Sequence, residues 1–205
     1  MGIYGHWVEP ALVSFACSLP PIRRERAKVV PDAAGAVLEI GFGSGHNAPF
    51  YDPQKVERLI GLEPSREMRA KAARRVGALA FPFSWLDLKA EEIPLDAASV
   101  DTVVSTFTLC TIPDAPRALA GVRRVLKPSG RLIFLEHGAA PDAGVRRFQD
   151  RLDPLWGRLA GGCHLARDPL ALVTAAGFRI AQAEQHYAAG APRFAGFLTS
   201  GVAIT

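Results

Sequence analysis

The 205-residue chain is long enough for one domain with a sizeable core, and its 49% hydrophobic and 21% charged residues are ordinary for a folded α/β protein. The net charge of +4 is modest, and acids interleave with the basic residues over several predicted helices, which disfavours a nucleic-acid surface. Three cysteines without a C-x-x-C pair argue against a disulfide framework and a structural zinc site, and favour reduced thiols in a cytoplasmic protein. The apolar stretch Ala11–Pro20 is far shorter than the ~20 residues that cross a bilayer, and no signal peptide is evident.

Residues 1–34 are predicted to form an N-terminal helical arm over the active site, followed by a single main domain over residues 35–205. Pro20-Pro21 interrupt the first apolar patch, and the basic helix that follows is most simply a solvated face. Tyr4 belongs to an aromatic cluster ahead of this patch, and the cluster could equally cover a ligand or pack in the core.

The stretch Val37–Ile40 is a short apolar run followed by glycine at positions 41, 43 and 45. Such a run predicts a buried parallel strand that enters a tight turn. Glycines without Cβ atoms let the backbone approach a ligand closely. The turn is expected to open into a helix, whose free N–H groups could receive a carboxylate or phosphate. The pattern therefore predicts a nucleotide-type binding turn.

Strands and helices alternate along the rest of the chain, which predicts an α/β fold with a doubly wound, mostly parallel sheet of seven strands. Further strands are expected at Arg58–Leu62, within Leu79–Leu86, at Ser99–Ser105 and at Leu132–Leu135, with helices at Ser65–Val76, Ala115–Leu126, Gly144–Leu159 and Asp168–Ala176. The last two extended runs, Phe178–His186 and Phe194–Ile204, are separated by only a short Gly-Ala-Pro segment. That gap is too short for a crossover helix, so these runs should form an antiparallel C-terminal hairpin.

The spacing of the glycines restricts the kind of nucleotide. The dinucleotide fingerprint G-x-G-x-x-G requires glycine where this chain has His46, and the pattern is instead acidic-x-G-x-G-x-G beginning at Glu39. A second acid, Glu63, ends the next predicted strand, where its two oxygens could accept both hydroxyls of a ribose.

At this point the chain resembles the class I S-adenosylmethionine-dependent methyltransferases. The resemblance rests on Glu39–Gly45, Glu63, Ala90–Pro94, Val100–Val104 and Lys127–Leu132. The closing hairpin also matches this family and not the NAD-binding folds. The resemblance implies a Rossmann-like methyltransferase fold, S-adenosyl-L-methionine as cofactor and S-adenosyl-L-homocysteine as product.

A narrower resemblance covers the C-terminal half. Thr108–Ile112, Leu135–His137, Asp153–Trp156 and Gly161–Arg167 are similar to the methyltransferase-like thiol S-methyltransferases and their bacterial relatives, some of which are labelled phospholipid N-methyltransferases. This implies a small apolar acceptor, with a thiol favoured. The animal relatives carry an N-terminal membrane anchor that this chain is expected to lack, although peripheral membrane contact stays open.

The wider resemblance also implies which residues bind the cofactor: Glu39, Gly41, Gly43, Gly45, Asn47, Glu63, Pro64, Ser65, Ala90, Glu91, Thr106 and Leu109. The glycines would approach its amino-acid end, Glu63 would bind the ribose and Thr106 would lie near the sulfonium. Many family members have aspartate where this chain has Lys89, so adenine recognition would depend on backbone groups and Glu91.

Methyl transfer depends on in-line placement of the nucleophile, and a thiol must also lose its proton, which an imidazole could assist. His137 is the first candidate and His164 the second, and either could instead cap a helix or close a hydrogen-bond network. The acceptor pocket is expected to involve Tyr4, Trp156, Cys163 and Arg167, although Trp156 could be plain core and Cys163 a packed thiol. No metal is expected.

Other functions stay open at this stage. Methylation of a phospholipid amine or a quinone precursor is the alternative within the family, and a non-catalytic or dehydrogenase-like cofactor-binding module is another. Enzymes that methylate amino groups of DNA place a D/N-P-P-aromatic tetrad after the fourth strand to bind the extruded base. This chain has Ser105–Thr108 there, so no nucleic-acid partner is expected, and the oligomeric state stays open.

Overall fold

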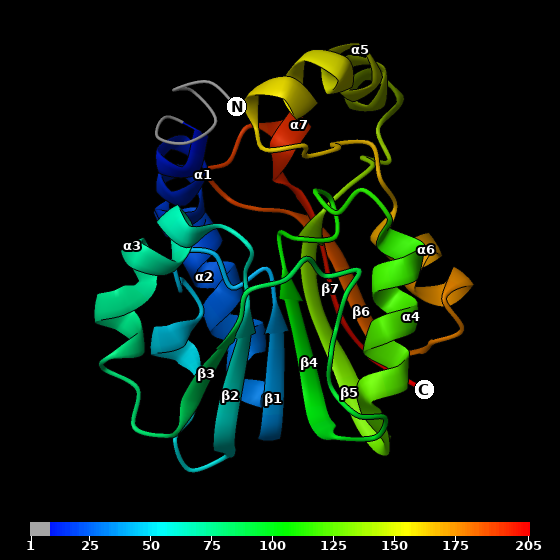
Figure 1. Cartoon of the computed structure of the whole chain (residues 1–205). Coiled ribbons are helices and arrows are strands. Elements are labelled where there is room, and N and C mark those ends of the chain that lie inside the picture. Colours follow the sequence, from blue (N-terminus) through cyan, green and yellow to red (C-terminus); the bar gives the residue numbers. More distant parts are fainter. Residues whose placement is uncertain (1–8) are drawn as a thin grey trace.

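The computed structural model describes residues 9–205 and contains one sheet of seven strands in the order β3-β2-β1-β4-β5-β7-β6 (Figure 1). The strands are β1 (Gly35–Ile40), β2 (Val56–Leu62), β3 (Phe83–Leu86), β4 (Val100–Thr106), β5 (Leu126–His137), β6 (Arg179–Tyr187) and β7 (Phe197–Ile204). The first five strands are parallel, and β7 pairs antiparallel with both β5 and β6. The predicted sheet and its closing hairpin are confirmed.

Helices cover both faces of this sheet, as expected of a doubly wound fold (Figure 1). The helices are α1 (Glu9–Ser18), α2 (Pro20–Val29), α3 (Arg66–Val76), α4 (Ala115–Val125), α5 (Ala143–Leu159), α6 (Pro169–Ala175) and α7 (Arg193–Gly196), with 3₁₀ turns η2 (Val30–Asp32) and η3 (Ala48–Phe50). Leu38 and Ile40 of β1 pack in the cluster that contains α4 and α6, whereas Val37 faces the cluster that contains η2 and α3. Alternate residues of one strand thus enter two separate cores.

Local signals explain where several helices begin and end. Ser65 caps α3 by accepting a hydrogen bond from Met68 N, and Asp168 caps α6 by accepting one from Ala171 N. Gly177 follows α6 with a φ of 85°, a conformation that glycine adopts without strain. The predicted helices Ser65–Val76 and Asp168–Ala176 thus begin at these two capping residues.

Two expectations about local structure are wrong. The glycine turn after β1 opens into turns and the three-residue η3, not into an α-helix, because Pro53 follows so closely that it disfavours helical backbone at Asp52. The stretch Phe194–Gly196 belongs to α7, so the last strand begins only at Phe197.

Within residues 9–205, no helix is both long enough and apolar enough to pass through a bilayer.

Candidate active site

A cavity of about 420 Å³ lies at the C-terminal ends of the parallel strands, where the sheet order reverses between β1 and β4. Ligands of open α/β sheets bind at this switch point. The loops after β1, β2, β3 and β4 form one side of the cavity, and α1 and α2 contribute Val13, Ser14, Cys17 and Arg26 from the other.

Eight of the twelve predicted cofactor residues line this cavity: Gly41, Gly43, Glu63, Pro64, Ser65, Ala90, Glu91 and Thr106. The other four, Glu39, Gly45, Asn47 and Leu109, do not line it. Glu39 and Asn47 lie beneath the cavity wall at 1% and 0% exposure. They contact the cavity wall from below, because Asn47 donates to Thr106, which lines the cavity.

The glycine turn has the backbone geometry that its sequence requires. Gly41, Gly43 and Gly45 have φ values of 67°, 57° and 78°, in the left-handed region that favours glycine. A Cβ on Gly41 would overlap the side chain of Thr108, whereas a Cβ on Gly43 would meet its nearest neighbour, Gly41 O, at 3.8 Å. Gly41 thus permits close packing of two loops, and Gly43 leaves room for a ligand.

Glu63 connects the glycine turn to the end of β2. One of its oxygens accepts from Gly43 N at 2.9 Å, and the other accepts from Ser65 N at 2.8 Å. Each carboxylate oxygen has a second lone pair, so both remain able to accept a ribose hydroxyl. Burial raises the pKa of Glu63, and the two backbone N–H groups oppose that shift.

A buried polar network lies below Thr106. Asn47 donates to Glu39 Oε1 at 2.9 Å and to Thr106 Oγ1 at 3.0 Å, and Tyr51 donates to Glu39 Oε2 at 2.6 Å. Burial raises the pKa of Glu39 to about 8, although Tyr51, Arg26 and Asn47 each oppose the shift. Glu39 therefore tends to be protonated near neutral pH.

Arg26 is a buried charge on the cavity wall, and the sequence interpretation missed it. It is 5% exposed and donates from Nη1 to Asn47 Oδ1 at 2.6 Å and to Thr106 Oγ1. Within the described part of the chain, its Nε has no hydrogen-bond partner and no carboxylate lies within ion-pair distance. A buried cation of this kind provides an unused donor and a positive potential for a ligand.

The aromatic ring of Phe107 packs against the Arg26 guanidinium. Its ring centroid lies 5.0 Å from the Arg26 guanidinium carbon, a cation–π contact. Phe107 has a φ of 54°, which is uncommon for a bulky residue and turns the chain sharply at the end of β4. Strain of this kind concentrates at ligand sites.

His46 and Cys17 are among the other cavity residues that the sequence interpretation missed. His46 Nε2 lies 3.0 Å from the carbonyl oxygen of Ser14, and burial, assisted by the charges of Arg26 and Arg75, lowers its pKa to about 4. The ring is therefore neutral near pH 7. Burial raises the pKa of the Cys17 thiol, and the charge of Arg26 opposes this shift.

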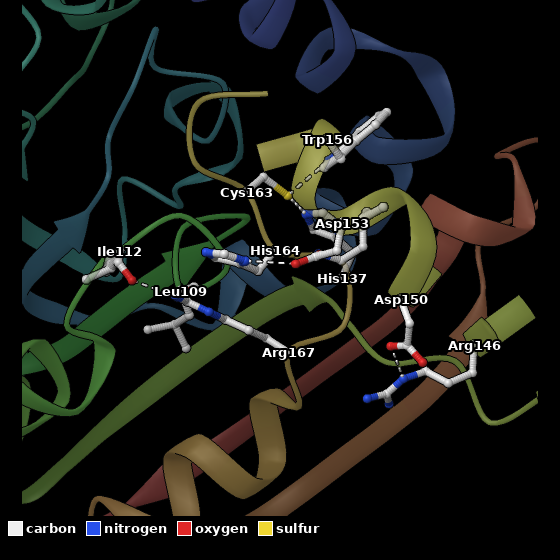
Figure 2. Close-up of polar contacts among 11 residues, drawn as sticks. Leu109, Ile112, His137, Arg146, Asp150, Asp153, Trp156, Cys163, His164 and Arg167 are labelled. Carbon is white, nitrogen blue, oxygen red and sulfur yellow. Dashed lines mark hydrogen bonds and ion pairs between the residues drawn. The ribbon is translucent and has the colours of Figure 1, made fainter. Parts of the chain in front are cut away.

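The predicted catalytic histidines lie outside the cavity lining, and neither is free (Figure 2). His137 Nε2 lies 3.1 Å from Cys163 Sγ, and Trp156 Nε1 donates to the same sulfur at 3.3 Å. His164 Nδ1 lies 2.9 Å from Asp153 Oδ2. Both histidines thus take part in hydrogen-bond networks, which is one of the alternatives that the sequence left open. A role in proton transfer stays a prediction.

Three of the predicted acceptor residues, Trp156, Cys163 and Arg167, do not line the cavity either. Arg167 donates to the carbonyl oxygens of Leu109 at 2.6 Å and Ile112 at 2.7 Å, so it holds the loop after β4 (Figure 2). Trp156 and Cys163 pack in a small cluster with Cys110. Tyr4 lies outside the described residues.

Glu136 also fixes the position of the loop after β4. It has no exposed surface and accepts from Ser105 Oγ at 2.8 Å, from Thr108 N at 2.9 Å and from Leu109 N at 3.1 Å. Because Thr106, Phe107 and Thr108 line the cavity and Glu136 does not, Glu136 supports this part of the cavity wall from behind.

Comparison with known proteins agrees with this geometry. Residues 38–134 match the methyltransferase domain family. The chain is 31% identical over 153 residues to the rat thiol S-methyltransferase TMT1B, covering 71% of this chain and 63% of the relative. It is 34% identical over 140 residues to the human thiol S-methyltransferase TMT1A, covering 67% and 57%. The chain thus spans less than two thirds of the length of these curated relatives.

A bacterial relative has a different acceptor in its name. The phosphatidylethanolamine N-methyltransferase of Cereibacter sphaeroides is 29% identical over 139 residues, with 63% of this chain and 68% of the relative covered. Sequence similarity thus extends to both thiol and amine methyltransferases.

Solved structures support the fold. An S-adenosylmethionine-dependent methyltransferase from Thermotoga maritima superposes with a TM-score of 0.66 at 21% identity, covering 98% of this chain and 97% of that one. The [4+2]-cyclase SpnF superposes with a TM-score of 0.67 at 19% identity, covering 96% and 80%. Residues 38–134 of this chain thus match a methyltransferase domain, and the sheet with its closing hairpin has the fold of the S-adenosylmethionine-dependent methyltransferases.

Proposed function

We propose that this chain transfers a methyl group from S-adenosylmethionine to a small apolar thiol. The observation that carries the proposal is Arg26, a buried cation on the cavity wall whose hydrogen-bond acceptors in the described structure are neutral. A positive charge in a low-dielectric site favours an anionic ligand and opposes a cationic one. A thiolate fits that site better than an ammonium group.

The residues around the cavity fit the cofactor. Glu63 retains two free lone pairs for a ribose, Gly43 leaves space above the turn, and Ala90 and Glu91 lie where the adenine edge is expected. When bound, the cofactor supplies an electrophilic methyl carbon. The protein then has to bind and orient the acceptor, exclude water and remove one proton from the acceptor's sulfur.

Arg26 is also expected to favour the loss of that proton from the acceptor thiol. A free thiol has a pKa of about 8.5, so only a small fraction is thiolate at neutral pH. Cys17 lies at the same wall, and there the Arg26 charge opposes the rise in thiol pKa that burial causes, although burial has the larger effect. We expect Arg26 to favour an acceptor thiolate by its charge, whereas His46 is a poor proton acceptor, because burial and the Arg26 charge lower its pKa to about 4.

An amine acceptor is the second candidate function, because of the phosphatidylethanolamine N-methyltransferase relative. Among the described residues that line the cavity, the two carboxylates are Glu63 and Glu91, at the ribose and adenine end. No acid therefore faces an ammonium group near Thr106 and Phe107. This distribution of charge favours the thiol.

The test is a matched acceptor panel. The purified protein is incubated with methyl-labelled S-adenosylmethionine and a short alkyl thiol, the corresponding alkyl amine or a dispersed phosphatidylethanolamine, and products are identified by mass. We expect the thioether alone. An N-methyl product without the thioether would overturn the thiol assignment, and a protein whose melting temperature neither S-adenosylmethionine nor its demethylated product raises would overturn the function as a whole.

A further inference from the structure

Two thiols and an imidazole from separate parts of the chain meet behind the cavity wall. The ligand-type atoms of Cys110, His137 and Cys163 all lie within 4.8 Å of one another, and the Cys163 sulfur is 3.1 Å from His137 Nε2. Cys110 follows β4, His137 ends β5 and Cys163 follows α5. Because no two of these residues are near in sequence, ligand spacing along the chain gives no sign of the cluster.

The distances fit a tetrahedral metal ion. Zinc–sulfur bonds of about 2.3 Å and zinc–nitrogen bonds of about 2.0–2.1 Å place the ligand atoms of a tetrahedron roughly 3.5–3.8 Å apart. The observed separations, from 3.1 Å to at most 4.8 Å, bracket this range and require only small side-chain rotations.

The surroundings also fit. Cys110 and Cys163 are 3% and 5% exposed, so bulk water has little access to their sulfurs. Trp156 Nε1 donates to Cys163 Sγ at 3.3 Å, the kind of outer contact that orients a metal-bound thiolate. The loops of the two cysteines are already joined, because His164 N donates to Cys110 O at 2.9 Å.

Metals bind cysteine as thiolate and histidine as neutral imidazole, so binding of a metal ion at this cluster would release the protons that its thiols hold.

We propose that Cys110, His137 and Cys163 bind one thiophilic divalent cation of the zinc type, with the fourth position occupied by water. Two thiolates and one imidazole form a donor set that prefers zinc to magnesium or calcium. The ion would join three loops directly behind the acceptor wall, because Thr111 follows Cys110, Gly161 precedes Cys163, and the Phe107 ring lies 6.0 Å from that of His137. This site is independent of the proposed acceptor.

The experiment uses the whole chain, reduced with a phosphine and freed of metal with a chelator. One equivalent of Zn²⁺ is added, excess is removed by gel filtration, and the retained metal is measured by elemental analysis. Co²⁺ is used in parallel, because thiolate ligands give a charge-transfer band in the near ultraviolet. We expect about one zinc per chain, a cobalt–thiolate band and a higher melting temperature with zinc.

The variants make the test specific. Changes in the outer contacts of a metal alone cost about 10–100-fold in affinity. C110S and C163S remove a ligand, so each is expected to weaken zinc binding by at least about a hundredfold and to abolish or weaken the cobalt band. C17S is the matched control, because Cys17 lies outside the cluster and its loss leaves both thiol ligands in place. Melting curves recorded in chelator show that each variant is folded.

Some outcomes would overturn the proposal. Zinc that is lost on gel filtration contradicts it, as does stoichiometric binding that C110S and C163S leave unchanged. Isolation of Cys110 and Cys163 as a disulfide that a phosphine does not reduce would also contradict it, because the sulfurs would then be unable to bind metal.

Discussion

Glu63 is the residue with the most specific expected effect on cofactor binding. Its oxygens contact Gly43 and Ser65 and would also accept the ribose hydroxyls. E63Q replaces one acceptor oxygen by a donor, and a hydrogen bond to a charged group is worth about 1.5–3 kcal/mol. We expect roughly ten- to hundredfold weaker binding of S-adenosylhomocysteine, measured by titration calorimetry. E57Q changes an exposed position of the same strand and is the control. Equal affinities of the two variants for S-adenosylhomocysteine would show that the ribose binds elsewhere.

Arg26 is expected to act on the acceptor. R26M removes the buried charge, so we expect a lower kcat/KM for the thiol and an upward shift of about one unit in the apparent pKa of its pH profile, equivalent to about tenfold at neutral pH. R26K retains the charge and should recover most of the activity. A pH profile that R26M does not shift would assign Arg26 a purely structural role toward Asn47 and Thr106.

At the scale of single residues, eight of the twelve residues predicted to bind the cofactor line the cavity, whereas His137, His164, Trp156, Cys163 and Arg167 do not. Gly41, Gly43 and Glu63 follow strands directly, so their place at the sheet edge depends only on local pattern. Arg26 stands in a basic run next to the exposed Arg23 and Arg24, and only tertiary packing distinguishes it from them. That is why a run of arginines resembled a solvated face.

At the scale of elements, two glycines of the turn after β1 have different roles. Both glycines have a left-handed φ, but a Cβ on Gly41 would overlap Thr108, whereas a Cβ on Gly43 would make only ordinary contacts at 3.8 Å or more. Alanine in this conformation costs about 1–2 kcal/mol. We expect G41A to lose more than this in the free energy of unfolding, measured with urea, because it also overlaps Thr108. G43A should lose only the backbone cost but bind S-adenosylhomocysteine more weakly, and equal losses of stability would contradict this division.

The element order was predictable because strand pattern, caps and turn residues agree along most of the chain. Ser65, Asp168 and Gly177 mark helix ends that the structure confirms. The expected helix after the glycine turn failed because Pro53 limits the segment to η3. The cluster of Cys110, His137 and Cys163 was not predictable, because three loops far apart in sequence bring its members together.

At the scale of the whole molecule, α1 and α2 matter because they complete the cavity that the sheet opens. Cys17 and Arg26 come from these helices, and the buried network below Arg26 extends through Asn47 to Glu39 of β1. The N-terminal helices are thus connected to the central strand by polar contacts. This arrangement makes the stability of the fold depend on the protonation of one buried carboxyl.

Glu39 determines the sign of that dependence. Its pKa is about 8 in the folded chain against an ordinary value of 4.5, so the folded state retains a proton that the unfolded chain has lost. Between pH 4.5 and 8 this group makes stability fall as pH rises, by up to about 1.4 kcal/mol per pH unit, and its effect is complete above pH 8. E39Q is neutral at every pH, so its melting temperature should fall less than that of the native chain from pH 5 to 8. E57Q should retain the native slope, since Glu57 is exposed. Parallel pH profiles for E39Q and the native chain would mean that Glu39 is already ionised beside Arg26, and the cavity would then be less positive than the thiol proposal requires.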